Sequence, residues 1–121
     1  MTLLVIQPDD NPGAATLKTS DPAVISAELS KRGVKFEQWH AGATIEPDAD
    51  SNAVLIAYVN DVQRLGEQGY DTVDVLRLNP DPADPEWNQK ALGARGKFLL
   101  EHTHDDDEVR YFVEGKGCFY R

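Results

Sequence analysis

The chain has 121 residues, about the size of one folded domain, and its 40% hydrophobic content is sufficient for a core. It carries 21 acidic and 12 basic residues, a formal net charge of -9, which argues against nucleic acid or an anionic membrane surface as a partner. No apolar run is long enough for a membrane span or a secretory signal, and the single cysteine, Cys118, leaves no internal disulfide. We therefore expect a cytoplasmic protein.

The first half of the sequence predicts mixed α/β structure. Apolar stretches bounded by Pro, Gly and Asp predict strands, and apolar residues at helical spacing predict helices. Asp21 or the preceding serine can cap the first helix, and Gly33 ends it. Residues 1–69 should therefore form an N-terminal region with two helices. The predicted elements are strands over 2–7 and 34–39 and helices over 20–33 and 50–68.

The second half, residues 70–121, turns toward antiparallel β structure. Its short apolar runs are separated by a proline-rich connection, an acidic turn and a Gly-Lys-Gly turn, which favour strands joined by hairpins. The connection has room for one short helical turn. The predicted elements are a strand over 73–78, a helical turn over 87–92, and strand pieces over 97–104, over 108–114 and from Cys118 onward.

One segment of the second half carries metal-binding chemistry. His102 and His104 are two residues apart in a predicted strand, so their side chains share a face and can bind one ion together. Glu108 follows across the acidic turn 105–107 and completes a 2-His-1-carboxylate set, which is associated with non-haem Fe(II) oxygenases. Imidazole and carboxylate also suit Ni(II), Mn(II) or Zn(II), so the spacing does not choose the metal. The alternative is that these side chains only hydrogen-bond to one another in a polar pocket.

Four other sequence features have a possible functional role and also a simpler structural interpretation. Arg110 shares a predicted strand face with Glu108, where it could hold an anionic oxygen ligand or pair with nearby acidic residues, and spacing favours neither. The acidic run 105–107 is expected to form a solvated turn rather than a Ca(II) site. Cys118 is expected to be a small buried apolar residue rather than a nucleophile. His40 is not spaced from other donors as a metal ligand would be, so we expect an ordinary surface or partly packed histidine.

The motif resembles that of a known superfamily. Gly96, His102, His104, Glu108 and Gly115 match every fixed position of the first cupin motif. The wider wording is similar to the acireductone dioxygenase family, and the similarity extends more weakly through the N-terminal half. The stretches that carry it are KFLLEHTH over 97–104 and DEVRYFVEG over 107–115.

The resemblance implies a mainly β fold, a single cupin-type antiparallel β-barrel preceded by the α/β N-terminal region with two helices. It implies one Fe2+ or Ni2+ per chain and a monomer when full length. Small-molecule acireductone, 1,2-dihydroxy-3-keto-5-methylthiopentene, and O2 would be the reactants in methionine salvage. With iron the family gives formate and the 2-keto acid precursor of methionine, and with nickel it follows an off-pathway route that releases carbon monoxide.

Site roles follow from the same resemblance, residue by residue. The metal ligands would be His102, His104 and Glu108. Arg110 would be the catalytic residue that binds the substrate dianion, with Phe98 beside the substrate. Glu101 and Asp107 would have supporting roles in metal uptake or in conformational coupling around the site.

The family also uses a further histidine from a later barrel strand, and the chain reaches Arg121 before that motif. We therefore expect residues 1–121 to be a single, C-terminally incomplete cupin domain that lacks its fourth ligand. Two other functions remain open from the sequence. One is an inactive or non-catalytic cupin fragment that binds metal weakly, and the other is a different metal cupin, such as an isomerase acting on a small polar substrate.

Overall fold

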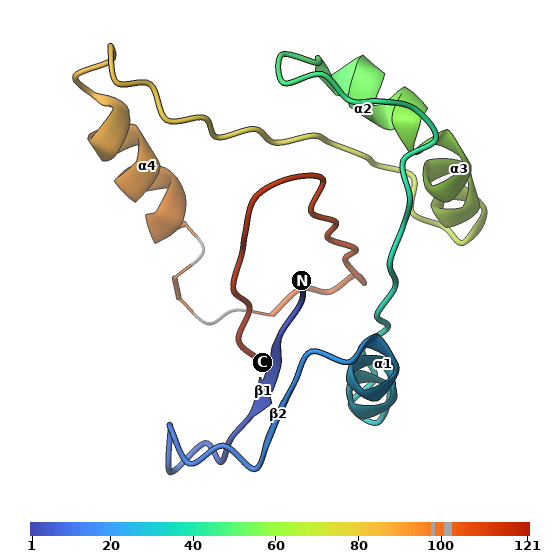
Figure 1. Cartoon of the computed structure of the whole chain (residues 1–121), viewed down its shortest axis with the longest axis vertical. Coiled ribbons are helices and arrows are strands. Elements are labelled where there is room, and N and C mark those ends of the chain that lie inside the picture. Colours follow the sequence, from blue (N-terminus) through green and yellow to red (C-terminus); the bar gives the residue numbers. More distant parts are fainter. Residues whose placement is uncertain (98, 101–102) are drawn as a thin grey trace. The chain divides into compact units, whose positions relative to one another are not determined.

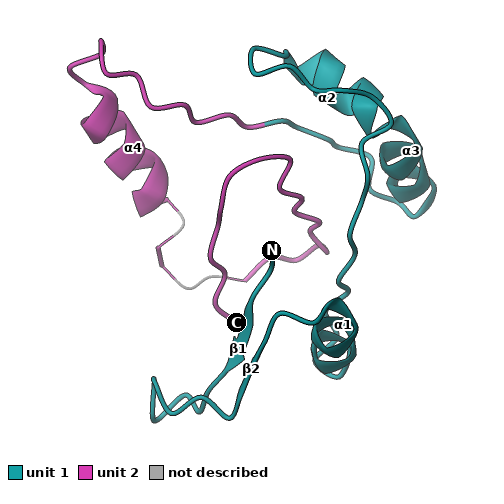
Figure 2. Cartoon of the chain, in the orientation of Figure 1, with its two compact units in different colours: residues 1–75 teal, residues 76–121 magenta. Residues whose placement is uncertain are grey.

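The computed structural model describes residues 1–97, 99–100 and 103–121, which fall into two compact units (Figures 1 and 2). Unit 1 is Met1–Val75 and unit 2 is Leu76–Arg121. No helix within the described ranges is long and apolar enough to cross a membrane.

A two-stranded antiparallel sheet opens unit 1. Strand β1, Leu4–Ile6, confirms the first predicted strand, and it pairs with β2, Leu17–Thr19 (Figure 1). Leu4 lies opposite Thr19 and Ile6 opposite Leu17. Strand β2 was not predicted, because three residues between a loop and a helix cap are too few to show an alternating pattern.

Helix α1, Pro22–Ser30, forms where the capping signals predicted it. Asp21 accepts hydrogen bonds from the backbone N–H groups of Ala23 and Val24, at 2.9 and 3.5 Å, and Pro22 occupies the first turn. After the helix, Gly33 has φ of 73°, in the left-handed region that favours glycine, so the chain turns back and the N–H of Val34 bonds to the carbonyl of Leu29.

The second predicted helix is present but broken in two. Helix α2, Ser51–Ala57, and helix α3, Val59–Glu67, meet at Tyr58, whose φ of -114° and ψ of 26° are not helical. In a continuous helix the Ala57 carbonyl would accept from the N–H four residues later. Here that carbonyl accepts from the N–H of Gly42 at 2.7 Å, so a distant loop takes the bond at the break.

The strands predicted at 34–39 and 73–78 are wrong, because both segments are irregular in the structure. An isolated extended segment gains little without a partner strand that completes its hydrogen-bond ladder. Residues 34–39 are instead tied down through side chains. Glu37 pairs with Arg64 of α3, so alternation in this segment reflects its packing on a helix rather than on a sheet.

Unit 2 contains helix α4, Trp87–Gly96, which is longer than the helical turn predicted at 87–92. Asp84 fixes its start, accepting from the backbone N–H of Glu86 at 2.9 Å and pairing with Lys90 at 2.8 Å. The hydrogen bond from Lys90 and the one from the Glu86 N–H lower the pKa of Asp84. The two glycines within 87–96 do not end this helix early.

The strand pieces predicted at 97–104, at 108–114 and from Cys118 are not strands in the described part of unit 2. Strands are stabilised by cross-strand pairs and one covered face. Phe112 and Phe119 expose 47% and 59% of their surface, so neither ring lies on a covered sheet face.

The core lies in unit 1 and is small. Ile25 of α1 is 1% exposed, and the other buried hydrophobic residues of the described chain, Val54, Ala57 and Tyr58, surround the break between α2 and α3. The predicted α/β N-terminal region is therefore present. The described chain as a whole is helix-rich, with four helices and one small antiparallel sheet, and does not show a mainly β barrel.

Candidate metal centre

Two of the three predicted metal ligands meet in unit 2. The chain bends at Asp105 and Asp106, and this bend brings His104 Nε2 to 3.5 Å from Glu108 Oε2. The two residues are four apart along the chain, so they lie on either side of one acidic turn, as the sequence predicted. An imidazole nitrogen and a carboxylate oxygen at this separation are donors that a first-row divalent ion accepts.

Arg110 contacts the other oxygen of the same carboxylate. Its Nε donates a hydrogen bond to Glu108 Oε1 at 2.8 Å, which is the ion pair that the sequence raised as one of two alternatives. Both oxygens of Glu108 therefore face a side chain of its own segment. The three side chains are 53% exposed for His104, 45% for Glu108 and 38% for Arg110, so solvent reaches the group from outside.

Aromatic side chains lie beside this group. The Arg110 guanidinium stands 5.6 Å from the centre of the Phe119 ring, and that ring is tilted against Phe112 with centres 5.6 Å apart. A Cβ at Gly117 would collide with the Phe112 ring, so the absence of a side chain there allows the ring its position. The segment thus holds Arg110 between a carboxylate and an aromatic face.

The remaining predicted site residues divide into two groups. Asp107 is exposed in the acidic turn. Phe98, Glu101 and His102 lie outside the described residues, and their predicted roles are not tested. Among residues 1–97, 99–100 and 103–121 there is no group of three or more His, Cys, Asp or Glu side chains that could hold a metal ion. The donor chemistry of His104 and Glu108 fits a divalent cation as far as the structure describes the set.

The thiol of Cys118 is exposed, so its prediction as a buried apolar residue is wrong. Cys118 lies in an irregular part of unit 2, so no sheet face is present there to cover its side chain. A hydrogen bond to Cys118 raises the pKa of Tyr120, which keeps the phenol neutral over a wider pH range.

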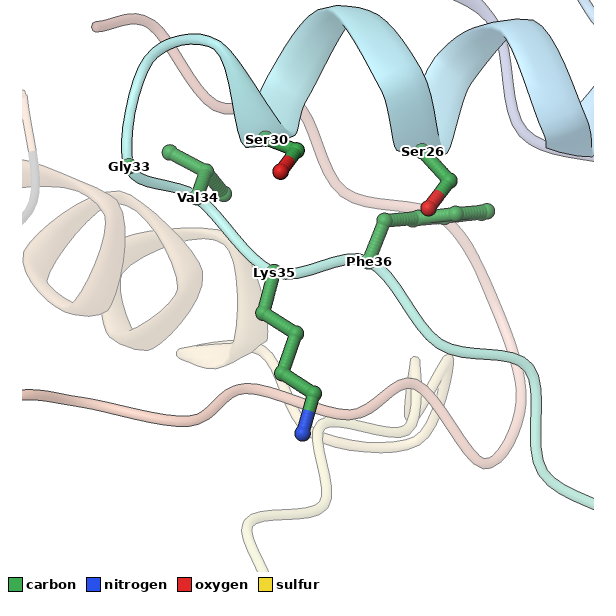
Figure 3. Close-up of a pocket in the computed structure, with 6 residues that line it drawn as sticks. All are labelled: Ser26, Ser30, Gly33, Val34, Lys35 and Phe36. Carbon is green, nitrogen blue, oxygen red and sulfur yellow. The ribbon is translucent and has the colours of Figure 1, made fainter.

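Two hollows in unit 1 are lined by other residues. One lies where the chain turns back along α1, and Figure 3 shows the hydroxyl groups of Ser26 and Ser30 facing this returning segment, while Lys35 extends away from the helix. The other lies at the break between α2 and α3, where His40 and Asn60 are in its wall. His40 is exposed, an ordinary surface histidine of unit 1 as predicted, and of the described metal ligands neither His104 nor Glu108 lines either hollow.

Unit 1 also contains a charged cluster, which we call the Glu37 cluster and which no sequence motif predicted. It consists of Glu37, Trp39, Asp61 and Arg64, with Lys35 at its edge. Arg64 donates to both oxygens of Glu37 and, at 3.1 Å, to Asp61, and its guanidinium stands 5.8 Å from the Trp39 ring centre. Trp39 Nε1 donates to Glu37 Oε2 at 2.8 Å.

The electrostatics of the Glu37 cluster follow from these contacts. Hydrogen bonds from Trp39, Arg64 and Lys35 lower the pKa of Glu37 from its ordinary 4.5 to about 2. The same carboxylate and that of Asp61 raise the pKa of Arg64. No local signal reveals the cluster, because its central ion pair joins residues 27 positions apart.

Comparison with known proteins covers almost the whole chain. The model of the ARD/ARD' family matches residues 3–120. An acireductone dioxygenase of Parvibaculum lavamentivorans (strain DS-1) is 52% identical over 121 residues, which are 99% of this chain and 62% of the relative. One of Granulibacter bethesdensis is 48% identical over 120 residues, 98% of this chain and 64% of the relative. Acireductone dioxygenase 1 of Nocardia farcinica is 45% identical over 123 residues, 99% and 64% of the two chains. No solved structure matches significantly.

The side chains that meet in unit 2 have donor atoms of the kind that a divalent ion accepts, and the relatives are named as acireductone dioxygenases. The chain belongs to the ARD/ARD' family. The recognition of this family from the motif over 96–115 is therefore confirmed. The chain spans 62% to 64% of the length of these three relatives.

Proposed function

We propose that this chain supplies the metal-binding segment of an acireductone dioxygenase, in which His102, His104 and Glu108 hold one Fe2+ or Ni2+ per chain. The observation that carries the proposal is the 3.5 Å approach of His104 Nε2 to Glu108 Oε2, within the segment whose spacing matches the first cupin motif. Membership of the family supports the same function.

The residues of the segment would act on an anionic enediol substrate. Arg110 would bind and charge-balance the substrate oxygens of 1,2-dihydroxy-3-keto-5-methylthiopentene, and its position beside Glu108 supports this role. Phe98 would pack against the substrate, and Glu101 and Asp107 would assist metal uptake or conformational coupling around the site. The bound metal would supply Lewis-acid stabilisation and a site for O2. The products would be formate and the 2-keto acid precursor of methionine with iron, and the carbon monoxide-releasing route with nickel.

The proposal includes a fold for the second half of the chain. We infer that the segments over 97–104, 108–114 and from Cys118 are strands of a cupin-type barrel when their pairing partners are present. Exposed apolar side chains support this inference, since in a strand Val109 and Val113 would share one face and Phe112 would lie on the other, and both faces could be covered within a barrel wall.

Titration with Fe2+ under nitrogen, and with Ni2+ in air, tests the metal site. We expect one ion per chain, with the affinity reduced at least tenfold in Glu108→Gln and in His104→Ala. Glu114→Gln and His40→Ala are matched controls, because each removes the same type of donor outside the proposed set. Equal affinity in Glu108→Gln and Glu114→Gln would mean that the ligand assignment is wrong.

A second assay separates the proposed function from its alternative, a non-catalytic cupin fragment that binds metal weakly. The half-exposed ligands His104 and Glu108 favour that alternative, because open sites hold metal less tightly than enclosed ones. Aerobic loss of acireductone absorbance is measured with the iron-loaded and the nickel-loaded chain. Loss above the buffer rate supports the dioxygenase, whereas metal binding without such loss supports the alternative.

A further inference from the structure

We propose that Arg110 is a built-in cation that occupies the Glu108 carboxylate until a metal ion displaces it, so that metal binding and release of the Arg110 guanidinium are one event. The inference rests on the proposed metal site. It adds a competition at that site and an order of binding, with metal first and anionic substrate second.

The first step is the occupancy of Glu108. Arg110 Nε donates to Oε1 at 2.8 Å while His104 Nε2 is 3.5 Å from Oε2, so the carboxylate already has a cationic partner on one oxygen and a metal-ligand partner on the other. A charge-assisted hydrogen bond of this length is among the stronger kinds, and it orients the carboxylate.

The second step is charge. A divalent ion that binds between His104 and Glu108 would stand a few ångströms from the guanidinium, and like charges at such distances repel even in water. The group is 38% to 53% exposed, so the repulsion is screened but not removed. The repulsion falls when the Arg110 guanidinium moves away from the ion.

The third step is the place to which Arg110 can move. Its guanidinium already stands 5.6 Å from the centre of the Phe119 ring, and Phe119 is supported by Phe112. A cation released from a carboxylate is stabilised over an aromatic face. The released guanidinium would then be able to present its Nε–H, which Glu108 now holds, to an anionic oxygen ligand.

Zn2+ tests the competition, because it accepts nitrogen and oxygen ligands and is diamagnetic and redox-inert. Calorimetric titration of the 121-residue chain with Zn2+ should show about fivefold tighter binding in Arg110→Gln. This is the change in affinity that corresponds to about 1 kcal/mol, the upper end of the usual energy of an exposed ion pair. Arg121→Gln is the matched control, since it removes the same charge from the same segment, and it should change the affinity less than twofold. Equal effects of the two substitutions, or weaker binding in Arg110→Gln, would overturn the proposal.

A measurement on the unsubstituted chain does not depend on how the variants fold. The Nε–H signal of Arg110 is assigned as the one that disappears in Arg110→Lys, and its exchange with water is followed by NMR during Zn2+ addition. We expect exchange to accelerate at least threefold as the hydrogen bond to Glu108 opens. An unchanged rate in the zinc-loaded chain overturns the proposal, whatever the affinities are.

Glu108→Gln distinguishes the failure of this inference from the failure of the proposed function. If Glu108→Gln leaves Zn2+ affinity unchanged, the metal site itself is wrong and the competition falls with it. If Glu108→Gln weakens Zn2+ binding and Arg110→Gln does not tighten it, the metal site stands and only the displacement of Arg110 is wrong.

Discussion

The guanidinium of Arg64 donates hydrogen bonds to both carboxylate oxygens of Glu37, at 3.2 and 3.0 Å, across 27 residues of sequence. This two-point contact ties the irregular segment over 34–39 to helix α3. Paired N–H donors in a fixed plane give such a contact a defined geometry, which a lysine could not reproduce.

Acid should weaken unit 1 through Glu37. Its pKa is about 2 in the folded chain and ordinarily 4.5, so its contribution to stability is complete above pH 4.5 and is lost as the pH falls from 4.5 toward 2. We expect Glu37→Gln to cost about 1 kcal/mol at pH 7, because the pair is partly exposed, and to flatten the pH dependence of unfolding below 4.5. Urea unfolding at pH 7 and pH 3 measures both effects. Glu46→Gln removes an exposed carboxylate elsewhere, and an equal effect there would contradict the assignment.

Trp39→Phe should shift the same acid response. The hydrogen bond from Trp39 Nε1 is the largest cause of the lowered pKa of Glu37, and phenylalanine keeps an aromatic face for Arg64 without that donor. We expect the pKa of Glu37 to rise toward its ordinary value, which moves the acid loss of stability to higher pH. NMR titration of the Glu37 side-chain carbonyl carbon gives the value directly. Trp87→Phe, a substitution in unit 2, should leave it unchanged.

Ile25 should be the most sensitive aliphatic position of unit 1. It is 1% exposed on α1, and truncation of a buried isoleucine to alanine typically costs about 2 to 5 kcal/mol. Ile56 is 68% exposed on α2 and provides a matched control, for which Ile56→Ala should cost less than about 0.5 kcal/mol. Thermal and urea unfolding followed by circular dichroism compares the two. A similar loss of stability in Ile25→Ala and Ile56→Ala would mean that Ile25 is not part of the core.

The helix caps should each contribute about 1 kcal/mol. Asp21 accepts from the Ala23 N–H at 2.9 Å and Asp50 accepts from the Ala53 N–H at 2.8 Å, so Asp21→Ala and Asp50→Ala leave helix donors without partners. Replacement by asparagine should retain most of the stability, because its carbonyl oxygen can still accept. Asp48→Ala, an exposed position near α2, should be neutral in the same unfolding measurements.

Sequence signals predicted the elements that depend on interactions between residues close together in the chain. Asp21, Pro22 and Gly33 lie within one helix and its ends, and α1 formed as they indicated. The break at Tyr58 depends on the bond between Gly42 and Ala57, which no helical periodicity contains. The predicted strands failed for the related reason that a strand depends on a partner elsewhere in the chain.

The metal segment shows the same division. Spacing alone brought His104 and Glu108 to either side of one turn, and the structure has them in contact. The position of Arg110 against Phe119 joins residues nine apart in an irregular segment, where no period relates their side chains. The roles of the individual residues, including those outside the described ranges, came from similarity to the family's sequence motif rather than from periodicity.

The aromatic pair at the helix break gives unit 1 an optical signal of its own. Tyr58 and Trp39 have ring centres 6.4 Å apart, a distance at which excitation absorbed by the phenol passes efficiently to the indole. With Trp87 replaced by phenylalanine, tryptophan emission excited through tyrosine would follow the approach of the loop to α2 and α3. The spectrum would also respond to Arg64 and Glu37, because a cation near the indole ring and a carboxylate at its N–H both shift the emission. Fluorescence followed during refolding would thus give the rate at which this tertiary contact forms, separately from the rate of helix formation.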